Sequence, residues 1–203
     1  MTNDPRAATN SGRSHREYYT ALYQAALTIS SSLELDAVLQ SVVISITEAM
    51  QVKACLLRLL DPRNGQLRLS AVHGLSSNYL AKGPVEVGHS PIDSEALQGK
   101  TVIISDVSVD TRFQYKEEAA REGIVSILCV PLEVHGNAIG VMRVYTNEQY
   151  TFHDDDIQFL SVLASLAALA IENASLYHNL KSSYDGVMDA LWGSSLPDEE
   201  QTV

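Results

Sequence analysis

The sequence predicts an α+β fold, a sandwich built on a central antiparallel sheet of five to six strands. The terminal helices are expected on one face of this sheet, with short helices and loops over the other. Helix-period patterns occur at both ends of the chain, and apolar strand-like runs lie between them in two pairs. Each pair is joined by a short polar turn, and strands joined in this way pair antiparallel.

Two helices are expected before the first strand. Residues 1–13 are rich in Thr, Asn, Ser, Gly and Pro, which is typical of a disordered N-terminal tail. From Ser14 onward, apolar residues recur mostly every three or four positions, which predicts a helix. A second helix is predicted from residue 35 or 36 to residue 50, with Asp36 as its candidate cap.

The two strand pairs form the predicted sheet. Residues 54–60 are apolar except for Arg58, residues 61–65 have turn chemistry, and residues 66–72 alternate between apolar and polar. These segments therefore predict a β-hairpin. The second pair is expected at residues 125–134 and 138–146.

The middle of the chain is less regular. Ser90, Pro91 and Asp93 predict a short helix, with Ser90 as the N-cap, Pro91 in the first helical position and Asp93 near the positive helix end. The other elements expected here are a strand at residues 101–105, a loop at 106–113, a helix around 115–122 and a sixth strand near 85–87.

A long helix is predicted after Phe152 and extends as far as Trp192. The run Asp154-Asp155-Asp156 complements the positive end of the helix dipole. The longest apolar stretch, residues 159–171, contains two serines and is too short to span a bilayer. We therefore expect a cytoplasmic protein with no membrane partner.

Charge and cysteine content argue against several classes of function. The chain has 14 Lys and Arg against 25 Asp and Glu, a net charge of −11. A nucleic-acid partner is not expected, because phosphate neutralisation needs clustered basic side chains. Cys55 and Cys129 each lie in an apolar run, so both are expected to be buried thiols. No histidines have the spacing of a metal site, so no metal is expected.

Several segments, taken in their order along the chain, resemble the GAF domain family over about residues 20–177. They are residues 99–107, the sequence Asp110-Thr111-Arg112-Phe113, the strand that contains Pro131, the strand that contains Gly140, and Phe152-His153-Asp154-Asp155-Asp156. The resemblance implies a GAF/PAS-like sheet with six antiparallel strands. It also implies a module that senses a small molecule and dimerises, and that is not an enzyme.

The resemblance leaves the ligand unknown and disfavours two kinds. In members that bind cyclic nucleotides an Asn-Lys pair recurs, whereas here Asn147 is followed by Glu148. Members that bind bilins attach them through a pocket cysteine, often beside a histidine, and neither Cys55 nor Cys129 has that neighbour. The reductase branch for free methionine sulfoxide uses several cysteines, and residues 73–123 contain none.

Six residues are candidate ligand contacts. His89 lies in the segment that covers the ligand cavity in the family, and Arg143 suits planar carboxylate or phosphate groups. Simpler interpretations also stay open: the strand arginines Arg58, Arg68 and Arg143 point outward or pair with a carboxylate, and His89 is a surface or capping residue. Asp106 and Arg112 would then pin a loop through an ion pair or a turn hydrogen bond. The full set of candidates is His89, Asp106, Arg112, Tyr115, Arg143 and Tyr145.

The last helix carries an apolar stripe that continues past the expected edge of the domain, and such a stripe needs a partner. We expect a parallel homodimer in which Tyr19, Tyr23 and Ala26 of the first helix accompany this stripe. The alternative is that the stripe packs only on its own sheet. The stripe comprises Leu169, Leu176, Leu180, Tyr184, Val187 and Leu191.

Together these features predict a domain at residues 14–177, preceded by the tail and followed by a helical extension at 178–192 and a polar tail at 193–203. The predicted function is a non-catalytic sensory or regulatory module whose ligand shifts the terminal helices. Its output is expected from a separate signalling protein or from a larger protein of which this chain is one part. Two alternatives stay open. One is a ligand-free dimerisation or scaffolding module, and the other is a small enzyme with an unrecognised site.

Overall fold

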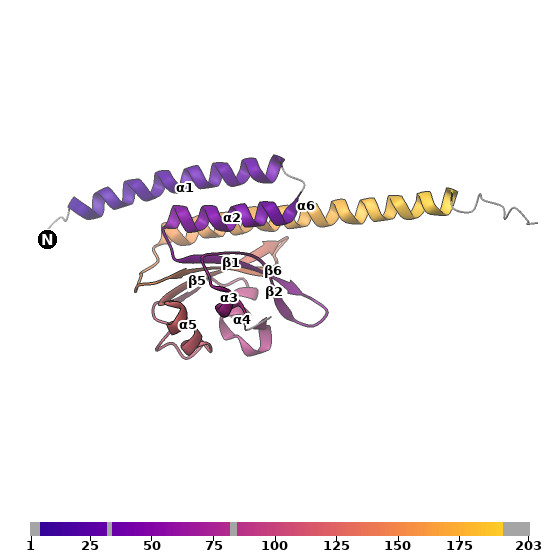
Figure 1. Ribbon diagram of the computed structural model, residues 1–203. Coiled ribbons are helices and arrows are strands. Elements are labelled where there is room, and N and C mark those ends of the chain that lie inside the picture. Colours follow the sequence, from indigo (N-terminus) through magenta and orange to yellow (C-terminus); the bar gives the residue numbers. More distant parts are fainter. Residues whose placement is uncertain (1–4, 32–33, 82–84, 193–203) are drawn as a thin grey trace, which may run out of the picture.

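The computed structural model describes residues 5–31, 34–81 and 85–192, and it arranges them in layers (Figure 1). Three long helices lie on one face of a sheet, and the short helices lie on the other. The helices are α1 (Pro5–Ser31), α2 (Leu35–Met50), α3 (Ser77–Leu80), α4 (Pro91–Leu97), α5 (Lys116–Glu122) and α6 (Asp154–Trp192), with a 3-10 turn, η1, at Val87–His89. The strands are β1 (Ala54–Asp61), β2 (Gln66–His73), β3 (Val85–Glu86), β4 (Val102–Ile104), β5 (Ser126–Val134) and β6 (Asn137–Thr146).

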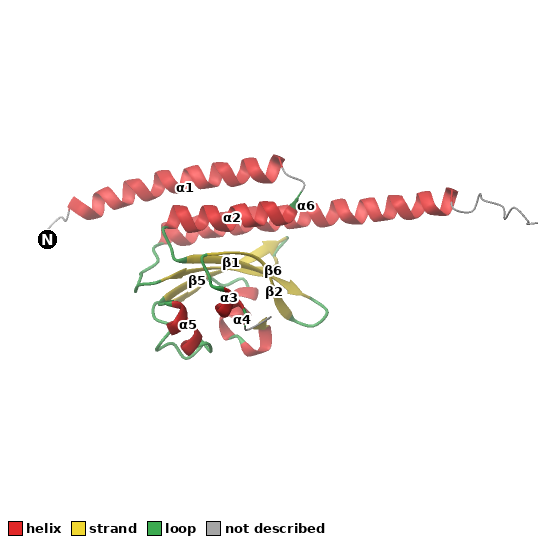
Figure 2. Cartoon of the chain, viewed as in Figure 1, coloured by secondary structure: helices red, strands yellow, loops and turns green. Residues whose placement is uncertain are grey.

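The strands form one sheet in the order β3-β2-β1-β6-β5-β4, and every neighbouring pair is antiparallel (Figure 2). The predicted α+β sandwich is therefore confirmed. Both hairpins occur where the alternating patterns placed them, and the sixth strand expected near residues 85–87 is β3. The first and last parts of the chain meet in the middle of the sheet, because β1 pairs with β6.

Some boundaries differ from the sequence-based expectations. Helix α1 begins at Pro5 and includes much of the expected disordered tail, because proline suits the first helical position and packing further along can support a polar turn. Asp36 lies within the first turn of α2, whose N-cap residue is Glu34. Residues 1–4 and the expected polar tail at 193–203 lie outside the described residues.

A hydrogen-bonded aromatic contact ties α1 to the start of α6. The Tyr18 hydroxyl donates to Asp156 Oδ1 at 2.5 Å, and its ring stacks on Phe159 with centroids 4.0 Å apart. The other carboxylate oxygen of Asp156 accepts from the backbone N–H of His153 at 2.9 Å, which caps α6. Because Tyr18 and Asp156 are both buried, this contact fixes how α1 lies against α6.

We expect Tyr18→Phe to lower the free energy of unfolding by about 1–3 kcal/mol, because a buried carboxylate oxygen loses its donor while the ring stacking is kept. Urea denaturation followed by circular dichroism measures this change. Tyr23→Phe is the matched control, since the Tyr23 side chain is 63% exposed on the same helix. Equal stability of the two variants would contradict the assigned role of Tyr18.

Pro131 and Gly140 lie where the sheet requires their special backbones. Strand β4 pairs only with residues 127–129 of β5, so Pro131 lies beyond the end of that ladder, where no N–H donor is needed. A Cβ atom on Gly140 would lie 2.2 Å from the carbonyl oxygen of Arg58 on the neighbouring strand. Gly140 therefore permits the close approach of β6 to β1 in the centre of the sheet.

Gly140→Ala should lower the free energy of unfolding by about 1–3 kcal/mol, because the added methyl group must push β1 and β6 apart. A Cβ atom at Gly88 meets nothing within 4 Å, so Gly88→Ala serves as the control. Thermal unfolding of the two variants in parallel tests this prediction. An unchanged melting temperature for Gly140→Ala would show that the strands adjust without cost.

Among the described helices, α6 has the length and apolar composition of a membrane span. The fold accounts for part of this apolar composition, because 39% of the most apolar 18-residue window of α6 is buried inside the protein. The first half of α6 packs on β5, α2 and α1. Its buried apolar side chains there are Phe159, Leu160, Leu163, Ala164, Ala167, Ala168 and Ala170.

Candidate functional site

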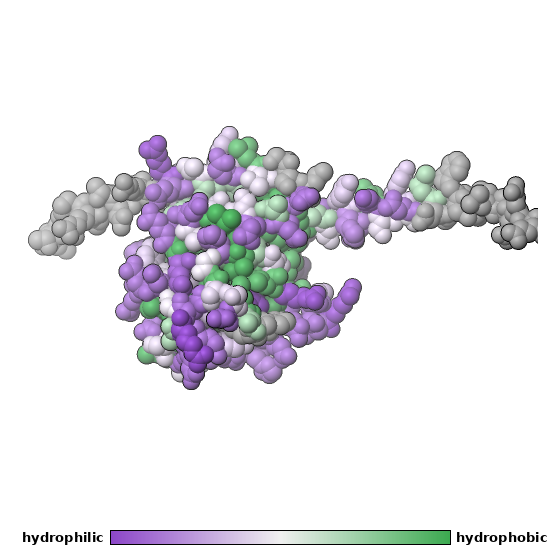
Figure 3. Space-filling model, viewed as in Figure 1, coloured by the Kyte–Doolittle hydropathy of each residue, from purple (hydrophilic) through white to green (hydrophobic). Residues whose placement is uncertain are grey.

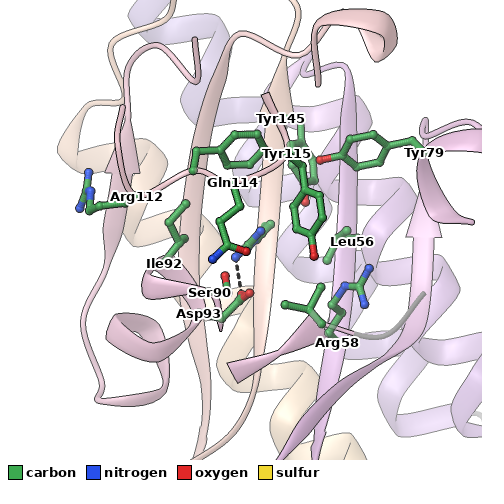
Figure 4. Close-up of a pocket in the computed structure, with 13 residues that line it drawn as sticks. Leu56, Arg58, Tyr79, Ser90, Ile92, Asp93, Arg112, Gln114, Tyr115 and Tyr145 are labelled. Carbon is green, nitrogen blue, oxygen red and sulfur yellow. Dashed lines mark hydrogen bonds and ion pairs between the residues drawn. The ribbon is translucent and has the colours of Figure 1, made fainter. Parts of the chain in front are cut away.

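A hollow lies on the sheet face opposite the long helices, between the central strands β1 and β6 and the covering segments (Figure 4). The register explains which strand residues reach it. Leu56 is directly opposite Arg143, so alternate residues from both strands share one face. The hollow is lined by Leu56, Arg58, Tyr79, Val85, Ser90, Ile92, Asp93, Arg112, Phe113, Gln114, Tyr115, Arg143 and Tyr145.

A buried ion pair crosses the hollow from the sheet to its cover. Arg143 of β6 donates through Nη2 to Asp93 Oδ1 of α4. Arg143 is 8% exposed and Asp93 is fully buried. Burial is the largest single effect on Arg143 and disfavours its charge, but the Asp93 carboxylate, together with Cys129 and Tyr145, raises the pKa of the guanidinium well above its ordinary value. Asp93 thus holds α4 down on the sheet.

Arg58 of β1 is a second buried cation in the same hollow. Its side chain is 4% exposed, and Nη1 donates to the carbonyl oxygen of Leu67 at 3.1 Å. Burial is the main cause of a lowered pKa at Arg58, and the nearby charge of Arg143 lowers it further. Neither Arg58 nor Arg143 points outward, because the covering segments enclose this face of the sheet, and Arg143 instead pairs with a carboxylate, the alternative left open by the sequence. Arg68 on β2 does point outward, with a 70% exposed side chain.

Tyrosine hydroxyls complete the polar lining. Tyr79 from α3 and Tyr145 from β6 meet edge to face, with ring centroids 6.3 Å apart. Burial raises the pKa of both phenols, so both stay protonated at neutral pH. Tyr115 is half-buried and comes from the loop before α5. In Figure 4 these three rings surround the hollow on the side away from Asp93.

Arg112 braces the outer wall of the hollow. It binds Asp110 through Nε at 3.1 Å and Nη2 at 2.8 Å, and Nη2 also donates to the carbonyl oxygen of Ile103. Glu95 of α4 is a further carboxylate, 3.6 Å from Nη1. Hydrogen bonds from Arg112 lower the pKa of Asp110. The positive charge of Arg112 is therefore already matched by two carboxylates.

The structure brings four of the six predicted contact residues together around the hollow: Arg112, Tyr115, Arg143 and Tyr145. The other two lie elsewhere. His89 points to solvent with a 77% exposed side chain, and its Nδ1 is 2.8 Å from Glu86 Oε2. Asp106 accepts hydrogen bonds from the N–H and hydroxyl of Ser108, which lower its pKa, and it does not line the hollow.

The sequence prediction missed Arg58 and Asp93 as site residues. Arg58 is the one charged residue in the apolar run at residues 54–60. Such a charge indicates a site when its face of the sheet is covered, because a buried charge needs a partner. Asp93 was assigned to the helix dipole, whereas its carboxylate pairs with Arg143. Ser90 does precede α4, but its side chain makes no capping hydrogen bond.

Most of the hollow is occupied by side chains. Counted out to its solvent-open mouth, it contains about 390 Å³ of space between atoms, of which about 20 Å³ is wide enough for the centre of a water molecule. Gln114 at this site is exposed, whereas the sheet residues beneath it are buried. A ligand larger than water therefore fits only if side chains that line the hollow move.

In the described part of the chain, neither the two cysteines nor a group of metal-ligating side chains forms a second site. Both thiols are buried, and burial raises the pKa of Cys129 to about 12 and that of Cys55 further still. No group of three or more His, Cys, Asp or Glu side chains is placed to bind a metal among residues 5–31, 34–81 and 85–192.

The second half of α6 projects beyond the body of the protein. Figure 3 shows apolar and polar side chains interspersed along this projection. The exposed fractions are 60% for Leu176, 72% for Leu180, 62% for Tyr184 and 58% for Val187, and Leu169 is 47% exposed. Leu191 lies within α6, but its side chain is outside the described set.

Comparison with known proteins gives one consistent result. The family model described as GAF domain matches residues 34–171. The chain is 27% identical over 192 residues to the methyl sulfide methyltransferase-associated sensor of Methanosarcina acetivorans, covering 86% of this chain and 19% of the sensor. It is 24% identical over 151 residues to the Nif-specific regulatory protein of Herbaspirillum seropedicae, covering 71% of this chain and 28% of that protein. The chain thus spans less than a third of either relative.

Among solved structures, the GAF domain of a phosphoenolpyruvate-protein phosphotransferase from Coxiella burnetii has a TM-score of 0.73 at 22% identity. The match covers 81% of this chain and 98% of that domain, and it shows that the fold is shared. With one relative named a sensor and another a regulatory protein, these similarities indicate a sensory or regulatory module.

Proposed function

Because this chain belongs to the GAF domain family, we propose that it is a non-catalytic sensory module that binds a small ligand in the hollow and signals through a homodimer of its terminal helices. The observation that carries the ligand site is the pair of buried arginines, Arg58 and Arg143, beneath the covering segments. A hydrophobic core of similar volume is often as stable as one that contains buried ion pairs, so packing alone does not explain two buried guanidinium groups.

The protonation states of the lining favour binding over catalysis. Asp93 is already engaged by Arg143, and burial keeps the phenols of Tyr79 and Tyr145 protonated. A nucleophile needs a lowered pKa, and burial raises the pKa of both phenols. The charged groups of the hollow are instead suited to hold an anion in place.

Signal transfer has a short path in this fold. Arg143 and Tyr145 lie on β6, and the chain leads from the end of that strand into α6 within eight residues. In this segment Tyr150 donates through its N–H to the Ser126 hydroxyl at 3.0 Å, and its own hydroxyl lies 3.3 Å from Asp156. A ligand that binds two arrangements of this connection with different affinity would shift the terminal helices.

The homodimer is supported by exposed apolar side chains on both terminal helices. On α6, an apolar side chain recurs every three or four residues from Leu176 to Val187, all exposed in the single chain. On α1, Tyr19 and Tyr23 are also exposed, while Tyr18 on the adjacent face is buried against α6. A parallel pairing of two copies along these helices covers both stripes.

A ligand screen tests the binding half of this proposal. The purified chain is examined by native mass spectrometry and by thermal shift against small carboxylates, phosphate, nucleotides and haem. We expect at least one class to raise the melting temperature, and Arg58→Gln to abolish that rise. Arg68→Gln is the matched control, because Arg68 lies exposed on β2. A response to no class, with an empty protein by mass, would overturn ligand binding.

One observation favours the rival function of a ligand-free dimerisation module. The space wide enough for water is only about 20 Å³, so the hollow as described is nearly full. This rival predicts a dimer that no small molecule stabilises. We also propose a cytoplasmic location and an output to a separate signalling protein. Both are compatible with the ligand-binding function and with the ligand-free function, and neither function requires them.

A further inference from the structure

The enclosed part of the hollow has one positive charge in excess. Among the described residues that line it, the fully charged side chains at least nine-tenths buried are Arg58, Arg143 and Asp93. Arg112 is 36% exposed and is matched by Asp110 and Glu95, so it adds no unbalanced charge. An uncompensated charge in a buried place is costly, so this excess favours a ligand with one negative charge.

The same groups have unused hydrogen-bonding capacity. Asp93 Oδ2 and Arg143 Nε are buried and have no hydrogen-bond partner within the described part of the chain. Arg58 uses Nη1 on a backbone carbonyl oxygen, and a guanidinium has five N–H donors. The hollow therefore offers donors at Arg58 and Arg143 and one unfilled acceptor at Asp93.

The free hydrogen-bond donors and the free acceptor lie on opposite sides of the hollow, the donors on the sheet and the acceptor on its cover. Arg58 projects from the sheet strand β1, whereas Asp93 projects from the covering helix α4 (Figure 4). A ligand that satisfies both must carry an anionic acceptor and, separately, a neutral hydrogen-bond donor. A zwitterion leaves the excess positive charge in place, and a dianion or phosphate monoester replaces it with an excess negative charge.

We propose that the hollow selects small monocarboxylates that carry a hydroxyl group, with the carboxylate on Arg58 and the hydroxyl donating to Asp93 Oδ2. This inference rests on the proposed ligand site and specifies its ligand class. Planar bidentate contact suits a guanidinium and a carboxylate, and the hydroxyl fills the buried acceptor that a plain carboxylate leaves empty. The limited space restricts the class to small members.

Isothermal titration of the full chain with four matched probes tests the inference. Lactate has one negative charge and a hydroxyl, propionate lacks the hydroxyl, alanine is a zwitterion, and malonate is a dianion. We expect lactate to bind tightest, with a dissociation constant roughly ten-fold or more below that of propionate, because a hydrogen bond to a charged group is lost in propionate. Arg58→Gln should abolish the preference for lactate over alanine, and Arg68→Gln should preserve it.

The outcomes distinguish an error in the proposed ligand class from an error in the proposed binding site. Equal binding of lactate and propionate, or tighter binding of alanine or malonate, overturns the class while the proposed binding function stands. Failure of all four probes at millimolar concentration also overturns the class, and the broader screen described above then decides whether the hollow binds anything. The comparison uses the unmodified protein, so it does not depend on any variant folding.

Discussion

Replacement of Arg143 by Met should lower the free energy of unfolding by about 3–5 kcal/mol, the largest effect expected from any single change in the site. The substitution leaves the Asp93 carboxylate fully buried, with the ion pair to Nη2 removed. Methionine fills much of the vacated volume, so the loss reports mainly the stranded charge and less a cavity. Chemical denaturation at pH 7 measures the change.

Two further variants make this result interpretable. Arg68→Met removes an exposed arginine whose carboxylate partner is 3.7 Å away, and it should cost less than about 1 kcal/mol. The double variant Asp93→Leu with Arg143→Met removes both charges and should recover most of the lost stability. If the double variant is no more stable than Arg143→Met alone, the two charges are not coupled as the structure indicates.

Replacement of Leu180 by Glu should convert the proposed homodimer into a monomer at micromolar concentration. Burial of a leucine side chain contributes about 1.5–3 kcal/mol, and the substitution removes two such side chains from one interface. The dissociation constant should therefore rise by a factor of roughly 10²–10⁴. Light scattering coupled to gel filtration gives the mass directly.

The stability of the single chain should not change in this variant, because Leu180 is 72% exposed there and touches none of the buried core. Ser182→Glu is the control, since Ser182 lies on the opposite side of the same helix turn, two residues away. A monomeric mass for the chain without substitutions would refute the dimer outright. A dimer that survives Leu180→Glu would place the interface elsewhere.

The sequence was sufficient for the elements with strong periodicity. The alternation in residues 66–72 and the turn residues before it predicted the first hairpin, because period-two patterning specifies a half-buried strand. Short elements were harder. Helix α3 at Ser77–Leu80 is a single turn capped by Ser76, whose side chain accepts from the N–H of Tyr79, and four residues carry no periodic signal.

The candidate site was only partly predictable for a related reason. Arg143 and Tyr145 were singled out because their strand alternates, and the register confirms that they share a face. Asp93 belongs to a segment fifty residues away in sequence from Arg143, and no local pattern indicates that pairing. Whether a strand arginine points to water or into a core depends on which face the covering segment occupies.

The sequence by itself determined the class of this fold, the antiparallel pairing of its hairpins and the long apolar stripe of the last helix, because each depends on periodicity and turn chemistry within short stretches. The tertiary structure alone decided that α4 lies over β6, that Asp93 meets Arg143, and that Arg58 is enclosed as an excess positive charge. Those three features depend on contacts between distant segments, and the energy of a buried charge is set by its neighbours in space rather than in sequence.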